Sequence, residues 1–156
     1  MGFSKQPDKR SRLIWSMITL AIIILGVGFV INFITGYLRS QDPIYQCIKN
    51  PNSQPFKLAV PITVTRDKNI VSVPTMIGFS NQCIKPIHTL EKNLIHVAYN
   101  RQYPFTLGHF LYIWGIDISR YNAKVYVNGT LYTRGSYLDI PLKNGIPIRV
   151  DFTSKA

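Results

Sequence analysis

The run "LIWSMITLAIIILGVGFVINFITGYL", residues 13–38, divides this chain of 156 residues into two unlike parts. It contains no charged side chain, and it is longer than the roughly 20 residues that an α-helix needs to cross a bilayer. A cleaved signal peptide would carry an apolar region of about 7–15 residues and then a small-residue cleavage site, and neither is present. We therefore expect an uncleaved signal anchor, a single transmembrane helix over residues 13–38.

The charges beside this run predict its orientation. Four basic residues and one acidic residue precede it, whereas the residues just after it are less basic. Positively charged flanks favour the cytoplasmic side of a membrane. We expect residues 1–12 to be a cytoplasmic basic segment and the C-terminal part to be extracytoplasmic, at the cell membrane.

Small and polar residues interrupt the apolar run. Asn32, Thr35 and the pair Gly26 and Gly28 suit contacts with a partner helix, because small and polar side chains mediate packing in lipid. The alternative is that these residues simply face lipid.

The part after the run is basic. From residue 39 onward it has 14 Lys or Arg against 6 Asp or Glu, a net charge near +8. Such a charge favours an anionic neighbour, either an acidic partner subunit or anionic lipid headgroups. The expected topology argues against nucleic acid as a partner. A solvated basic surface is the alternative.

The two cysteines, Cys47 and Cys83, both lie in the part expected outside the cell. An oxidising compartment favours a disulfide between them. In the chain-entropy model a loop of this length gives about 4 kcal/mol of stabilisation. Two free thiolates that bind a metal are the minor alternative, because neither cysteine lies in a C-x-x-C pair.

Residues 39–56 contain three prolines and many polar residues, which is typical of a linker, and residues 57–156 form one β-rich domain. Residues 57–65 and 69–74 predict a hairpin around "RDK", with Pro61 at a sheet edge or bulge. Residues 75–83 are expected to form a loop.

A helix and further strands follow. "TLGHFLYIWG", residues 106–115, has apolar residues at helical spacing, a capping threonine and a terminal glycine. Asn128-Gly129 predicts a hairpin with a type I′ turn. Two more short strands are expected about a second Asn-Gly, Asn144-Gly145. The order of elements indicates an α+β fold, a β-grasp-like sheet packed on one helix.

Histidines are the candidate metal ligands. If Leu90 pairs with Leu94 around an "EKN" turn, His88 faces His96 across a hairpin, and a shift of one residue separates them. Two facing imidazoles suit copper or zinc, with Glu91 or His109 as a third ligand. The alternative is that these histidines form structural hydrogen bonds or face water.

Motifs that assemble a catalytic site are missing. The sequence has no G-x-S-x-G, P-loop, H-E-x-x-H or G-x-G-x-x-G pattern. Glu91 is the single glutamate, and the aspartates fall at expected turns, linkers and strand ends, which gives no paired carboxylates for acid–base chemistry. We expect no catalytic residues and no enzyme activity of the chain itself. Asn128-Gly129-Thr130 is also a glycosylation sequon.

An ordered set of motifs runs through the last 100 residues: "VPTMIGFSNQC", "HTLE", "FTLGHFLYIWG", "AKVYVNG" and "LDIPL". This set resembles a family of small membrane-anchored extracytoplasmic domains of ammonia-oxidising archaea. Its members carry a pattern close to "IPAGIG…C…LHTHD…GIIHIES…FTLGxFFxIWG…VxVYVNG…DIPL". The resemblance implies the same fold, and it suggests the copper-dependent ammonia monooxygenase of archaea as a partner.

Departures from the family pattern weaken its polar cluster. His88 and Thr89 match the first half of "HTHD", but Leu90 replaces its second histidine and Glu91 its aspartate. His96 matches the histidine of "HIES", whose carboxylate is lost. The first strand, "LAVPITV", lacks the H-x-H that relatives often carry. The resemblance thus predicts the fold better than a metal site.

Together these observations predict a non-catalytic, single-pass accessory subunit of a membrane protein complex. Its helix would pack among other membrane helices, and its basic domain would cover the extracytoplasmic face of a larger partner. The alternative function is an extracytoplasmic copper- or zinc-binding protein that delivers or buffers the ion. A free-standing sensor or adhesion module is a third.

Overall fold

The computed structural model describes residues 9–155, without the side chains of residues 9–13, 39 and 40. Most of the expected cytoplasmic segment, residues 1–12, lies outside this description. The chain forms two compact units, Met1–Asp42 and Pro43–Ala156, which are considered separately below.

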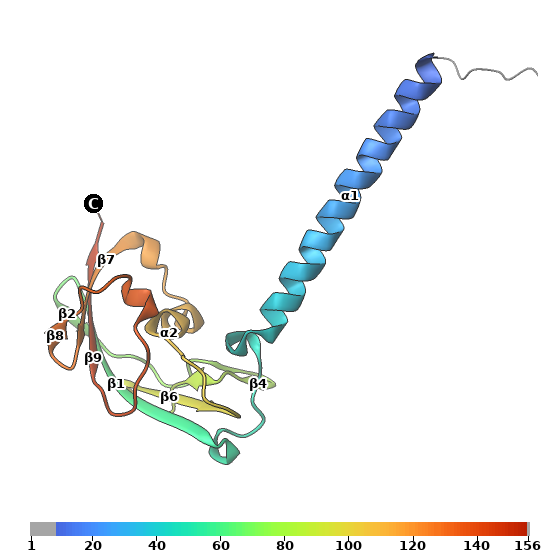
Figure 1. Cartoon of the computed structure of the whole chain (residues 1–156). Helices are drawn as coiled ribbons and strands as arrows, with labels where there is room; N and C mark the ends of the chain where they lie inside the picture. The colour runs from blue at the N-terminus through green and yellow to red at the C-terminus, as the bar shows by residue number, and fades with distance from the viewer. Residues whose placement is uncertain (1–8, 156) are drawn as a thin grey trace, which may run out of the picture. The chain divides into compact units, whose positions relative to one another are not determined.

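The first unit is one helix, α1, over Lys9–Gln41 (Figure 1). Its segment Ile14–Leu38 is long and apolar enough to cross a membrane, and all of its side chains are exposed. The hydroxyls of Thr19 and Thr35 donate to the carbonyls of Trp15 and Ile31, at 3.0 and 2.8 Å. These two polar groups are therefore satisfied within the helix.

The second unit is a mixed sheet covered by one α-helix. Its strands in chain order are β1 (Phe56–Arg66), β2 (Asn69–Val71), β3 (Phe79–Ser80), β4 (Cys83–Ile84), β5 (Ile87–His88), β6 (Leu94–Tyr99), β7 (Tyr121–Val127), β8 (Thr130–Leu131) and β9 (Ile148–Ser154). The main sheet has the order β5-β6-β1-β9-β7-β8, with β2 also paired to β1, and β3 and β4 form a separate ribbon.

The directions of these strands confirm the predicted fold class. The first long strand, β1, and the last, β9, are parallel neighbours at the centre, and all other pairs are antiparallel. On one side of this central pair, β6 pairs with β1, and on the other side the β7–β8 hairpin pairs with β9 through β7. Together with helix α2 between β6 and β7, these strands form a β-grasp-like α+β domain.

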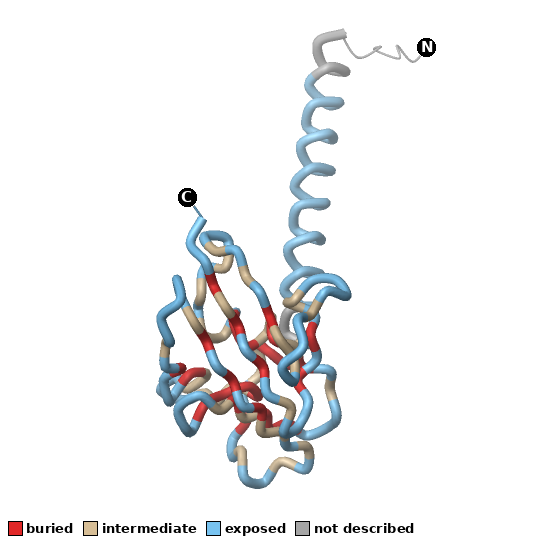
Figure 2. Tube along the Cα trace, turned by 90° about the vertical axis from the view of Figure 1, so that its left-hand side faces the viewer, coloured by how far each residue is buried: buried red, intermediate tan, exposed pale blue. Residues whose placement is uncertain are grey.

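Helix α2, Leu107–Trp114, has both predicted caps. The Thr106 hydroxyl accepts from the His109 backbone N–H, and Gly115 ends the helix at φ 78°. Its buried residues Leu107, Phe110 and Leu111 belong to the same apolar core as the strands. On the sheet side, Val60, Ile62 and Val64 alternate inward along β1, and Figure 2 shows this alternation of buried and exposed positions. Full burial of one such side chain contributes about 1.5–3 kcal/mol.

Pro61 lies in a central strand rather than at an edge or bulge. The Ile62 N–H donates to the Asn93 carbonyl on the β6 side. Because successive backbone N–H groups of a strand point to opposite sides, the N–H position of residue 61 faces β9. Pairing with β9 begins only at Ile62, opposite Ile148. The N–H that proline lacks would therefore meet no ladder partner.

Of the two short strands predicted about Asn144-Gly145, only the second forms, as β9. Tyr137–Asp139 form a 3-10 helix, η4, and the backbone after it pairs with the entry to α2: Leu107 N–H donates to the Ile140 carbonyl at 2.8 Å. The side chains of Ile140 and Leu142 are buried in the core, and this burial favours the packing of the segment beside α2. Asn144 Oδ1 accepts from the Ala59 N–H at 2.9 Å. The Asn144 side chain therefore replaces a strand partner for β1 at a point where β9 has not begun.

Residues expected as a linker or loop are partly structured. Two 3-10 helices, η1 (Pro43–Tyr45) and η2 (Pro51–Ser53), lie in the expected linker, 39–56, and Ile44 and Ile48 in it are buried. Within the expected loop, 75–83, the β3–β4 ribbon forms. A third 3-10 helix, η3 (Ile118–Arg120), precedes β7.

The predicted disulfide between Cys47 and Cys83 is present, with Cα atoms 5.0 Å apart. Beside it, Ile48 N–H donates to the Ile84 carbonyl at 2.8 Å. These two connections explain why the segment before β1 folds onto the domain: it is bonded covalently to the ribbon.

Candidate functional site

His88 and His96 face each other on neighbouring strands. Of the two registers that the sequence allowed, β5 and β6 adopt the one with His88 opposite His96. Their ring centroids are 6.0 Å apart and their planes differ by 18°. The turn between the strands contains Asn93 at φ 60°, and its side chain accepts from the Val73 N–H, which fixes the register.

His88 is held as a neutral imidazole. The ring is 1% exposed, and its Nδ1 lies 3.0 Å from the Lys85 carbonyl oxygen. A carbonyl can only accept, so Nδ1 carries the hydrogen and Nε2 the lone pair. Burial lowers the pKa of His88 below its ordinary value of 6.5. A backbone carbonyl behind Nδ1 is the usual support of a metal-binding histidine.

His96 carries the one buried side-chain nitrogen or oxygen without a hydrogen-bond partner among the described residues, its Nε2. Leaving such a group unpaired costs about 1–3 kcal/mol. The ring borders a pocket of about 250 Å³, whose lining includes His88, Leu90, Lys57, Asn52 and Asn144. The unpaired nitrogen marks this pocket as a candidate for a ligand, an ion or water.

The two expected third ligands are not brought to this pair. Glu91 is exposed in the turn between β5 and β6. His109 Nδ1 accepts from the Thr106 N–H at 3.1 Å and completes a capping box at the start of α2. Within residues 9–155, no three His, Cys, Asp or Glu side chains form a group that could hold a metal ion.

What remains is a pair of imidazoles with open coordination positions. Copper and zinc accept imidazole nitrogen, and water or an external group would supply their other ligands. The Lys57 ammonium in the same pocket opposes a cation there, although it already donates to the Asn52 carbonyl at 2.7 Å. The Cys47 and Cys83 sulfurs are joined in the disulfide, which removes the thiolate alternative.

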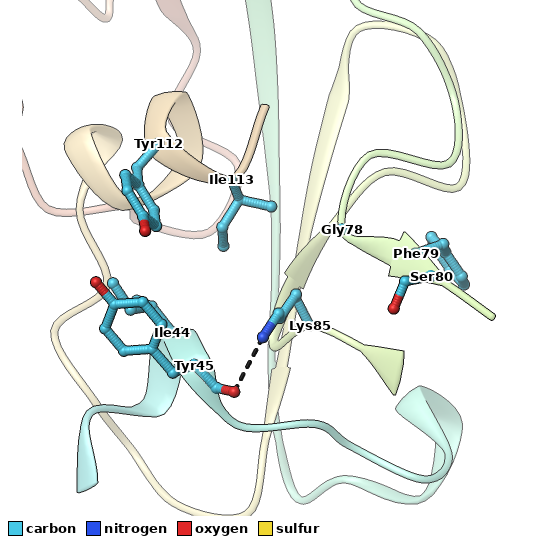
Figure 3. A pocket seen from close by; sticks show the side chains of 8 residues that line it. All are labelled: Ile44, Tyr45, Gly78, Phe79, Ser80, Lys85, Tyr112 and Ile113. Atoms are coloured by element: carbon cyan, nitrogen blue, oxygen red, sulfur yellow. Dashed lines mark hydrogen bonds between the residues drawn. The ribbon is translucent and has the colours of Figure 1, made fainter. Parts of the chain in front are cut away.

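A second pocket was not predicted from the sequence. It measures about 380 Å³ and is lined by Ile44, Tyr45, Gly78, Phe79, Ser80, Lys85, Tyr112 and Ile113 (Figure 3). Tyr45 stands two residues before one cysteine of the disulfide, and Lys85 two residues after the other. The expected disulfide was therefore the one signal that could have brought these two residues together.

Searches for relatives add no assignment. No protein-family model matches the chain, and no curated protein or solved structure shows a significant match to it.

Proposed function

We propose that this protein is a non-catalytic, single-pass accessory subunit of a membrane protein complex. Its sequence resemblance makes the copper-dependent ammonia monooxygenase of archaea the first partner to test. The observation that carries the proposal is one face of α1, where Gly28, Asn32 and Gly36 recur every four residues. Residues four apart share a helix face.

Asn32 is the polar centre of this face. In the described part of the chain its carboxamide has no hydrogen-bond partner, whereas Thr19 and Thr35 are satisfied by their own helix. Asn32 lies six residues, about 9 Å, from the middle of Ile14–Leu38, which places it within a hydrocarbon core about 30 Å thick.

An amide in hydrocarbon is costly unless it finds a partner, and neighbouring helices commonly supply one. A methyl group added at Gly28 or Gly36 would meet no atom within 4 Å, so this face is free to accept a closely packed helix. Both properties support a partner subunit with a polar group at matching depth.

The domain contributes a second, weaker support. Its net charge near +8 suits an acidic surface on a larger partner, with the N-terminus in the cytoplasm and the domain outside. Charge complementarity would guide docking, while the helix would fix the assembly.

The proposal is tested by extraction of native membranes in a mild detergent, followed by native electrophoresis and mass spectrometry. We expect the chain to migrate in a complex much larger than 17.8 kDa with stoichiometric partners. Migration of the chain alone, under conditions that keep other membrane complexes intact, would contradict it.

The unpaired Nε2 of His96 favours a second candidate function, extracytoplasmic copper or zinc binding by His88 and His96. Copper(I) or zinc would be titrated into the full chain in detergent. The His96→Gln variant should lose at least about tenfold in affinity, since removal of a ligand or of its support commonly costs about 10–100-fold.

His109→Gln is the matched control. Glutamine at this position can keep the capping box of α2, so the helix should persist while one histidine is lost. Equal affinity of the wild-type chain and the His96→Gln variant would exclude the metal function.

A further inference from the structure

The pocket of Figure 3 is lined by apolar residues, two tyrosines, Ser80 and Lys85, and by no acidic side chain. Lys85 is its one charged residue, and its Nζ donates to the Tyr45 carbonyl at 2.9 Å. An ammonium has three hydrogens, so this bond holds Lys85 in place and leaves two donors for a ligand. The charge of the pocket therefore selects an anion.

Two tyrosines supply the other side of the pocket. The rings of Tyr45 and Tyr112 meet edge to face with centroids 6.0 Å apart, and Figure 3 shows both rings on one side of the pocket, Phe79 and Ser80 on the other, and the Lys85 amine between them. A phenol and an ammonium beside apolar ring surface make the lining of the pocket amphipathic.

A disulfide and a close backbone contact hold the walls of this pocket in place. The Cys47–Cys83 disulfide joins the segment that carries Tyr45 to the ribbon that precedes Lys85. Gly78, at φ 79°, packs so closely on Ile87 that a Cβ there would collide with the Ile87 carbonyl oxygen. A site built on a disulfide and a close backbone contact can bind a small group without prior ordering.

The chain also links the pocket to the apolar segment. Tyr45 follows Leu38, the last residue of that segment, by seven positions, and seven fully extended residues span at most about 25 Å. A lipid headgroup that carries a phosphate is therefore one source of an anion to test.

We propose that this pocket binds a phosphate group through Lys85, with the Tyr112 hydroxyl as a further donor. The phosphate would come from a membrane lipid headgroup or from free phosphate, since both present the same acceptor oxygens. Charge-assisted hydrogen bonds to such oxygens are the strong ones. No residue that lines this pocket also lines the histidine pocket, although the Lys85 backbone carbonyl holds His88 Nδ1. The Lys85 amine, which the proposal uses, belongs to neither proposed function.

The test is amine footprinting on the full chain, with the rate of Lys85 acylation read by mass spectrometry. Three states are compared: a phosphate-free maltoside detergent, the same detergent with inorganic phosphate, and nanodiscs of phosphatidylglycerol. Lys49 is the matched reference amine, because it is exposed and two residues from Cys47 but does not line the pocket.

We expect Lys85 acylation to slow by about tenfold relative to Lys49 in the state that supplies the ligand, as a charge-assisted hydrogen bond would cause. Protection in nanodiscs alone identifies a lipid headgroup, and protection by inorganic phosphate alone identifies a free anion. An unchanged ratio of Lys85 to Lys49 in both states would overturn the proposal.

A variant gives an independent readout. Lys85→Gln keeps a donor for the Tyr45 carbonyl but lacks the charge, so saturable phosphate uptake in a calorimetric titration should disappear while the melting temperature stays close to wild type. Uptake undiminished in Lys85→Gln would also overturn the assignment. Tyr112→Phe, which removes one hydroxyl from an exposed ring, should weaken uptake less than Lys85→Gln.

Discussion

The membrane helix and the β domain satisfy their side chains in opposite ways. In the domain, residues far apart in sequence meet: Thr65 donates to Asp151, and Ala59 N–H to Asn144. In the described part of α1, the threonine side chains bond only to residues three or four positions away on the same helix. Among the described residues of the domain, His96 Nε2 is the one buried side-chain nitrogen or oxygen without a partner. The helix, by contrast, has at its polar centre a side chain, Asn32, that its own residues leave unpaired.

This difference separates what folding requires from what assembly requires. Substitutions in the domain should change stability, because the contacts that they remove are within the chain. Substitutions on the Gly28, Asn32 and Gly36 face should leave the domain folded and change assembly instead.

The largest effect should come from the core side of α2. Phe110→Ala removes a fully buried ring and should lower the free energy of unfolding by about 3–5 kcal/mol. Tyr112→Ala, on the exposed side of the same helix, should cost much less, about 1 kcal/mol or below. Denaturant unfolding of the full chain in detergent measures both, and equal losses would show that α2 is not packed as described.

Reduction of the Cys47–Cys83 disulfide should cost the domain about 2–4 kcal/mol, because the bridge restricts a long loop of the unfolded chain. The melting temperature with and without reductant measures this loss. The helical signal of α1 should be unaffected, since the helix has no part in the bridge. Loss of both signals together would break the distinction between the two units.

Buried His88 should make stability depend on pH. Because burial lowers the pKa of His88, the unfolded chain binds the proton first as pH falls through about 6.5. This contribution to stability is therefore fully present above pH 6.5 and declines below it, by at most about 1.4 kcal/mol per pH unit. Unfolding would be measured across this range with a chelator present.

Two variants test whether His88 causes this dependence of the unfolding free energy on pH. His88→Gln should remove most of the dependence, whereas His109→Gln should retain it, because His109 caps α2 and is not part of the histidine pair. A slope that persists in His88→Gln would place the titration elsewhere.

Two glycine substitutions, one in each unit, should have the smallest effects on stability. Gly129 has φ 78° in the β7–β8 turn, so Gly129→Ala should destabilise the domain by about 1 kcal/mol. Gly26→Ala in α1, where no atom is near, should leave the domain unchanged. Thermal melting distinguishes the two, and a loss in the second variant would show that α1 supports the domain.

Much of the fold could be predicted because its signals are local. The apolar run, the helix caps at Thr106 and Gly115, and the turn at Asn128-Gly129 each specify their own backbone. The strand expected just before Asn144-Gly145 does not form, which shows the limit of local signals. The Asn144 side chain accepts from the Ala59 N–H, 85 residues away, and no local sequence pattern predicts that contact.

The candidate sites follow the same rule. The facing of His88 and His96 was predictable up to a choice of register, which depends on the three-residue turn. The unpaired Nε2 of His96 and the Lys85 pocket were not predictable, because both arise where three or more segments meet. The capping role of His109 was also missed, although histidine occupies the third helical position after the capping threonine.

We propose that the unpaired face of α1 holds this chain in a membrane complex. The Asn32→Leu variant removes the carboxamide from that face, and Ile34→Leu is a control of similar size away from it. We predict that Asn32→Leu leaves the domain melting temperature unchanged but releases the chain from the complex on native electrophoresis, and that Ile34→Leu does not. Retention of the Asn32→Leu chain in an intact complex would contradict the account.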